Sequence, residues 1–79
     1  MNNTRTSKIM KYEIRISLDK ALKNRNKTRY WLAQQTGIHY KTIDSYYKNK
    51  IKRYEADSIL KMCIALECDP GDIIEINKK

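Results

Sequence analysis

The sequence predicts an all-α fold, a compact bundle of about five helices that includes two short helices joined by a tight turn. Apolar residues recur at helical spacing along most of the chain, cap residues precede the apolar runs, and Gly37 stands where one helix must end. At 79 residues the chain has the length of one domain. We expect residues 12–79 to form that domain, preceded by a flexible basic N-terminal arm over 1–11.

The first patterned stretch, residues 12–16, alternates apolar and charged residues, which is the period of a strand. Residues 73–76 are rich in β-branched isoleucine. The two stretches can form a small terminal strand pair, because a lone strand would leave its backbone groups unbonded. The alternative is a helix in which Ile14, Leu18 and Leu22 form one stripe at i, i+4 and i+8.

A first helix is expected over about residues 17–24. The hydroxyl of Ser17 can cap it, and Asp19 lies in the first turn, where a carboxylate interacts favourably with the helix dipole. The apolar side chains of its buried stripe are Leu18, Ala21 and Leu22. The basic segment 24–27 then interrupts the apolar pattern.

Residues 28–47 predict two short helices, over about 29–36 and 40–48, with a turn at Gly37. Thr28 is a suitable cap for the first of them. The side chains spaced to face one core are Leu32, Ile38, Ile43 and Tyr46. This is the layout of a helix-turn-helix, whose second helix enters a DNA major groove. An ordinary helical hairpin in a small bundle is the alternative.

Two more helices follow. The stretch 55–66 has a broad apolar face and is expected to be the central core helix, with Ile59, Leu60, Cys63, Ile64 and Leu66 on that face. Asp69 can cap a last short helix that has Pro70 at its first position.

The net charge of +8 is unevenly distributed. Residues 20–54 contain ten Lys or Arg and a single acid, Asp44, whereas residues 55–75 contain six acids and a single base, Lys61. The positive half coincides with the expected helix-turn-helix. A basic surface over this motif indicates a nucleic-acid partner.

Other features narrow the class of protein. No apolar run approaches the ~20 residues of a membrane helix, and no secretion signal is present, so we expect a cytoplasmic protein with no membrane partner. Cys63 and Cys68 are then expected to be reduced, with Cys63 as a core thiol, and a lone histidine disfavours zinc. No nucleophile–base pair, carboxylate cluster or phosphate loop is present, so we expect neither an enzyme nor a cofactor nor a small-molecule substrate.

The outer face of the second helix of the motif should read bases. Lys41 can donate to O6 and N7 of guanine, and Asp44 can either accept from N4 of cytosine or orient Lys41 or Arg29. The expected base-reading residues are Tyr40, Lys41, Asp44 and Ser45.

Around this helix lie groups suited to phosphate. Arg29 stands at a helix N-terminus, where its charge opposes the helix dipole unless an anion lies nearby. His39 can contact phosphate or cap the second helix. The expected phosphate-binding residues are Thr28, Arg29, His39, Thr42, Lys48, Asn49, Lys50, Lys52 and Arg53.

The stretches 32–38, 42–43 and 60–74 together resemble the Cro and repressor type of helix-turn-helix protein, also called the XRE family, in its short single-domain branch. The resemblance covers about residues 14–76. It implies a lambda-repressor-like bundle of about five helices that binds operator DNA sequence-specifically, commonly as a homodimer.

The resemblance also implies residue roles. Tyr40, Lys41 and Ser45 match the family's base readers, and Lys48 and Asn49 match the loop that grips the DNA backbone. The sequence departs from the family at three matching positions: Arg29 replaces a glutamine that touches phosphate and braces the second helix, His39 replaces a small residue, and Asp44 adds a negative charge to the reading face.

The sequence therefore predicts a transcriptional regulator, acting as a repressor, that places the helix over 39–47 in the major groove of an operator. An antitoxin or inhibitor-type module that binds a protein through the same fold is the alternative. A third possibility is a protein that binds DNA or RNA without regard to sequence.

Overall fold

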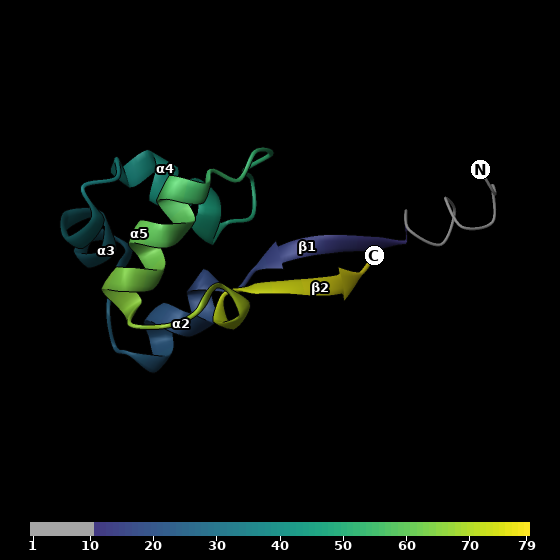
Figure 1. Ribbon diagram of the computed structural model, residues 1–79, viewed down its shortest axis with the longest axis horizontal. Coiled ribbons are helices and arrows are strands. Elements are labelled where there is room, and N and C mark those ends of the chain that lie inside the picture. The colour runs from purple at the N-terminus through teal and green to yellow at the C-terminus, as the bar shows by residue number, and fades with distance from the viewer. Residues whose placement is uncertain (1–10) are drawn as a thin grey trace.

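The computed structural model describes residues 11–79, which form a helical body and a projecting two-stranded ribbon (Figure 1). The elements in order are β1 (Tyr12–Ile16), α2 (Leu18–Asn24), α3 (Arg29–Thr36), α4 (Tyr40–Tyr47), α5 (Ala56–Leu66), the 3-10 turn η1 (Pro70–Asp72) and β2 (Ile74–Lys78). Over these residues the fold is mostly helical rather than all-α. It has four α-helices, and the expected fifth helix is the single turn η1.

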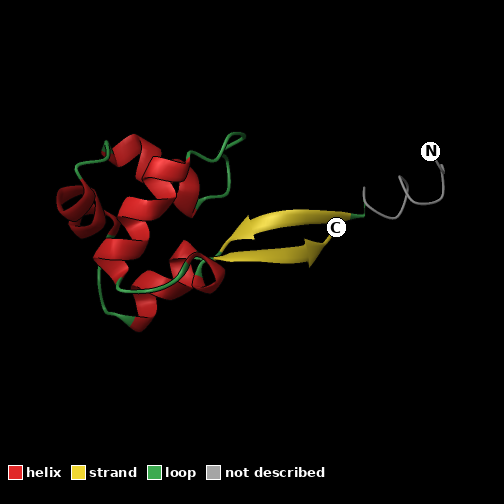
Figure 2. Cartoon of the chain, viewed as in Figure 1, coloured by secondary structure: helices red, strands yellow, loops and turns green. Residues whose placement is uncertain are grey.

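The ribbon joins the two ends of the described chain (Figure 2). β1 and β2 pair antiparallel, with Ile14 opposite Ile76 and Ile16 opposite Ile74. The predicted strand pair is therefore confirmed. The alternative helical stripe through Leu18 is excluded, because the backbone is a strand up to Ile16 and becomes helical only at Leu18.

The core lies where the helices meet the base of the ribbon. Every α-helix contributes at least one buried side chain, and the fully buried ones are Ile16, Leu18, Leu32, Ile43, Tyr46, Met62 and Ile73. Tyr46 is 1% exposed and uses its hydroxyl to accept from the backbone N–H of Glu55 (3.1 Å), so its polar end is satisfied inside the body.

The expectation for α5 was partly wrong. Met62, Cys63 and Leu66 are buried, but Leu60 and Ile64 are 56% and 67% exposed. Each residue of an α-helix turns by about 100°, so the positions two before Met62 and Leu66 point away from them. α5 thus buries one face and leaves an apolar face uncovered by the described residues.

Helix ends account for the turn between α3 and α4. The Thr28 hydroxyl oxygen accepts from the Trp31 N–H (3.0 Å), which confirms it as the cap of α3. α3 ends at Gly37, whose φ of 74° is left-handed, and its N–H donates to the Ala33 carbonyl (2.9 Å). Ser17 does not cap α2 through its side chain. Its hydroxyl instead donates to the Asp72 carbonyl (3.4 Å).

Two further observations bear on the expected organisation. The predicted arm, residues 1–11, lies outside the described residues except for Lys11, whose carbonyl accepts from the Lys79 N–H (2.7 Å). No helix within residues 11–79 has the length and apolar character needed to cross a bilayer.

Candidate nucleic-acid interface

Helix α4 presents one face to the core and the other to solvent. Ile43 and Tyr46 point inward, Lys41 and Lys48 are exposed, and Ser45 is half-buried. The helix-turn-helix expected from the sequence is therefore present, with α4 in the position of the reading helix.

The N-terminal turn of α4 carries an aromatic pair. The rings of Tyr40 and Tyr30 stack with centroids 4.5 Å apart and planes inclined by 22°. Tyr30 is 66% exposed, so the pair lies at the surface beside Lys41. Sequence reasoning missed Tyr30. Its signal was weak, a single aromatic residue at the second position of α3.

His39 caps α4. Its Nδ1 accepts from the Lys41 N–H (3.2 Å), which leaves Nε2 outside this bond. This is one of the two roles expected for His39. Ser45 donates its hydroxyl hydrogen to the Lys41 carbonyl (3.0 Å), so its oxygen can still accept from a ligand.

Asp44 lies between two cations. Its carboxylate accepts from Arg29 of α3 and from Lys48 one turn further along α4, the latter at 3.2 Å. Partial desolvation would raise the pKa of Asp44, but the hydrogen bonds and charges of Lys48 and Arg29 outweigh it and hold the pKa below its ordinary value. The carboxylate is therefore ionised at neutral pH and orients Arg29, one of the roles expected from the sequence.

Arg29 braces α3 against α4 in two ways. Besides the ion pair with Asp44, its guanidinium carbon lies 4.4 Å from the centroid of the Tyr47 ring, a cation–π geometry. The arginine thus links the two helices, at the position where the resemblance to the Cro and repressor type leads us to expect a bracing glutamine. The helix-dipole penalty expected for Arg29 is offset by Asp44.

Basic residues follow directly after α4. Lys48, Lys50, Lys52 and Arg53 are all exposed. Thr28 caps α3, and Thr42 lies in the first turn of α4. The structure thus gathers the expected phosphate-binding groups around α3, α4 and the segment that leaves α4.

Asn49 differs from the other residues of this set. Its Oδ1 accepts from the Ile16 N–H (2.6 Å) and its Nδ2 donates to the Ile16 carbonyl (2.9 Å). Its φ of 57° is left-handed. The side chain holds the end of α4 to β1, so its amide is engaged within the protein and we leave it out of the phosphate-binding set. Sequence reasoning missed this tether, which spans 33 positions.

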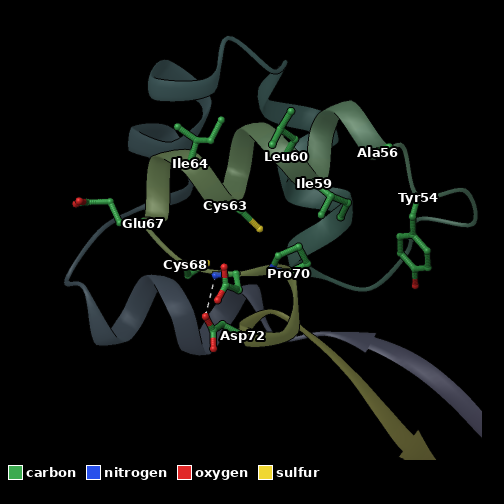
Figure 3. Close-up of a pocket in the computed structure, with 11 residues that line it drawn as sticks. Tyr54, Ala56, Ile59, Leu60, Cys63, Ile64, Glu67, Cys68, Pro70 and Asp72 are labelled. Atoms are coloured by element: carbon green, nitrogen blue, oxygen red, sulfur yellow. Dashed lines mark hydrogen bonds between the residues drawn. The ribbon is translucent and has the colours of Figure 1, made fainter.

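A second surface runs along α5 and η1, where a groove of about 830 Å³ is open to solvent (Figure 3). Its apolar lining includes Leu60 and Ile64, acidic groups of Glu67 and Asp72 border it, and none of its lining residues belongs to α4. Burial, together with the neighbouring Cys68, raises the pKa of the Cys63 thiol in this groove to about 11. Cys63 is therefore a protonated thiol at neutral pH.

Comparisons with known proteins agree with this geometry. No curated protein matched the chain. A solved structure of a candidate DNA-binding protein from Bacteroides fragilis superposes with a TM-score of 0.71 at 27% identity, covering 80% of this chain and 100% of that one. The transcriptional regulator VanUg superposes with a TM-score of 0.71 at 28% identity, covering 86% of this chain and 89% of that one. Residues 17–79 match the Cro/C1-type helix-turn-helix DNA-binding domain. The chain belongs to the Cro/C1-type helix-turn-helix DNA-binding family.

Proposed function

We propose that the protein is a sequence-specific transcriptional regulator that places α4, with its cap His39, in the major groove of an operator. It acts as a repressor by occupying that operator, as a homodimer, in the cytoplasm and without catalysing a reaction. The family and the similarity to VanUg support the general activity.

One observation carries the proposal: α4 is held in place without using the side chain of Lys41 in its N-terminal turn. Arg29 and Asp44 fix it to α3, and Asn49 fixes its end to β1. Lys41 remains exposed on the outward face. A rigid helix with unengaged donors is what base recognition requires, because mobile groups would lose entropy on binding.

The proposed contacts follow from these positions. Lys41 donates to a guanine, and Tyr40 and Ser45 contact neighbouring bases. Asp44 acts by aligning Arg29 and Lys48 toward phosphates on either side of the groove. The proposed phosphate contacts are Thr28, Arg29, His39, Thr42, Lys48, Lys50, Lys52 and Arg53.

Selection of bound sequences from a random DNA pool, followed by charge-matched variants, tests this proposal. Lys41→Ala and Lys61→Ala each remove one exposed helical lysine, but Lys61 lies on α5 and pairs with Asp57 at 3.0 Å. We expect Lys41→Ala to weaken binding to the selected site by about 10- to 100-fold and to relax specificity at one or two base pairs. Lys61→Ala should change it by about twofold or less. Equal losses in the two variants would show that only net charge matters, and the reading role of α4 would be refuted.

The alternative, an antitoxin or inhibitor-type protein-binding module, is favoured by the apolar groove on α5. The same selection separates the two functions. A DNA-binding regulator enriches a defined motif over random DNA by ~10³-fold or more, whereas a protein-binding module enriches none.

A further inference from the structure

We propose that two copies of this chain associate through the outer edge of β2, forming a continuous four-stranded antiparallel sheet in the order β1–β2–β2–β1. A two-fold axis passes beside Ile76. This inference deepens the proposed function, because it rests on a regulator that acts as a dimer and names the surface that makes the dimer.

The ribbon is incomplete as an isolated unit. Two-stranded sheets are marginally stable in water unless further strands or an apolar cover are added. Ile14 and Ile76 pair across the ribbon and are 49% and 74% exposed, and Tyr12 on the same face is 43% exposed. At the base of that face Ile16 is fully buried in the core. The apolar face therefore continues from the core onto the ribbon, where residues 11–79 do not cover it.

The two edges of the ribbon are not equivalent. On the β1 edge, the N–H and carbonyl of Ile16 are both bonded to the Asn49 amide, so this edge is closed next to the body. The bond from the Ser17 N–H to the Ile73 carbonyl shows that Ile16 and Ile74 are a non-hydrogen-bonded pair.

That pairing decides which backbone groups of β2 face outward. Because the pattern alternates along an antiparallel ladder, the N–H and carbonyl groups of Ile74, Ile76 and Lys78 point away from β1. Within residues 11–79 no hydrogen bond reaches them. An edge of three outward-facing residues is a template for another strand.

The charge sequence of β2 makes this edge self-complementary. Acids lie at its start, Asp72 just before the strand and Glu75 within it, and bases lie at its end, Lys78 and Lys79. Antiparallel pairing of two copies places the acidic start of one strand beside the basic end of the other.

With the two-fold axis at Ile76, each residue of one β2 strand lies opposite a compatible residue of the other. Ile76 meets Ile76 of the second copy, and Glu75 lies opposite Asn77, so no like charges lie directly opposite each other. Each Glu75 is also paired with Arg15 of its own chain (3.4 Å). The two apolar faces then join into one, with the isoleucines of both ribbons side by side. The helical bodies lie at opposite ends of the sheet, and each presents its own α4. The operator of such a dimer is palindromic.

The test compares two lysine substitutions on adjacent residues of β2. Ile76→Lys places two like charges at the axis, whereas Asn77→Lys adds the same charge on the opposite face of the sheet, beside Glu75 of the second copy. Molecular mass is measured by sedimentation equilibrium over a series of protein concentrations, and circular dichroism monitors the fold. We expect a dimer for the wild type and for Asn77→Lys, and a monomer of unchanged helical content for Ile76→Lys.

A second variant addresses the backbone edge itself. Ile76→Pro removes an outward N–H that the β1–β2 ladder does not use, so the ribbon should persist while strand addition is blocked. A monomeric wild type, or dimers in both Ile76 variants, would overturn the proposal. So would loss of the dimer in Leu60→Lys on α5 with no loss in Ile76→Lys, because the interface would then be the α5 groove.

Titration of the protein with half-site and palindromic DNA tests the β2 interface separately from the proposed regulator function. Monomeric Ile76→Lys should bind a single half-site as the wild type does and lose about 10²-fold or more at the palindromic site. If no DNA sequence is bound selectively by the wild type, the regulator is refuted, while the mass measurement still decides the β2 interface.

Discussion

Helices α4 and α5 are built alike toward the core and differently toward solvent. α4 buries Ile43 and Tyr46, and α5 buries Met62 and Leu66. The outer face of α4 is polar and cationic. The outer face of α5 has exposed leucine and isoleucine bordered by carboxylates. The inward faces of both helices therefore determine the fold. The outward faces differ in function: the cationic face of α4 suits a polyanion such as DNA, and the apolar, acidic face of α5 does not.

The largest expected effect is the salt dependence of DNA binding. With the eight phosphate contacts proposed around α4, affinity for the selected site should fall by ~10³-fold or more between 50 and 200 mM salt. Lys48→Ala should reduce the slope of log K against log salt by about one, because it removes one contact. Lys61→Ala on α5 should leave the slope unchanged. Fluorescence anisotropy over a salt series measures it, and a flat dependence would contradict an interface on the α4 side.

Truncating one apolar side chain on each helix compares the contributions of α4 and α5 to stability. Ile43 of α4 is fully buried, whereas Leu60 of α5 is 56% exposed. Ile43→Ala should lower the free energy of unfolding by about 2–5 kcal/mol, since it leaves a cavity. Leu60→Ala should cost less than about 1 kcal/mol. Urea unfolding gives both values, and similar losses would mean that Leu60 is covered in solution, for example by a partner.

The smallest expected effect concerns specificity and uses a matched pair of carboxylates. Asp44→Asn on α4 removes the group that orients Arg29 and Lys48, and it also removes a negative charge from the DNA side. We expect binding to random DNA to strengthen and the ratio of selected to random affinity to fall on the order of tenfold. Asp57→Asn on α5, which breaks only the pair with Lys61, should leave the ratio unchanged. Competition binding measures this ratio, and an unchanged ratio in Asp44→Asn would remove the orienting role.

Local sequence signals predicted much of the fold. The cap at Thr28, the left-handed Gly37 and the apolar spacing around Ile43 act within one or two turns, and they locate the helix-turn-helix. The alternation in 12–16 predicted the strand correctly. Such signals succeed because the interactions they depend on are short-range.

The errors concern long-range contacts. Helical spacing identifies the apolar residues of α5 but not which side its neighbours cover, so Leu60 and Ile64 were placed in the core. The phosphate contact predicted for Asn49 from its basic segment stays a prediction, but the bond between its amide and Ile16, which is 33 positions away, was missed. The hydroxyl of Ser17 likewise bonds across the chain to Asp72 rather than capping α2.

The Asn49 amide bears on the spacing of the two half-sites that the proposed dimer would bind. It connects the end of the reading helix to the same ribbon that we propose as the dimer contact. In such a dimer the Asn49 amide, together with the burial of Ile16 in the core, sets the span between the two reading helices. A substitution of Asn49 is therefore expected to change the preferred spacing of the two half-sites while every proposed base-contacting side chain stays the same.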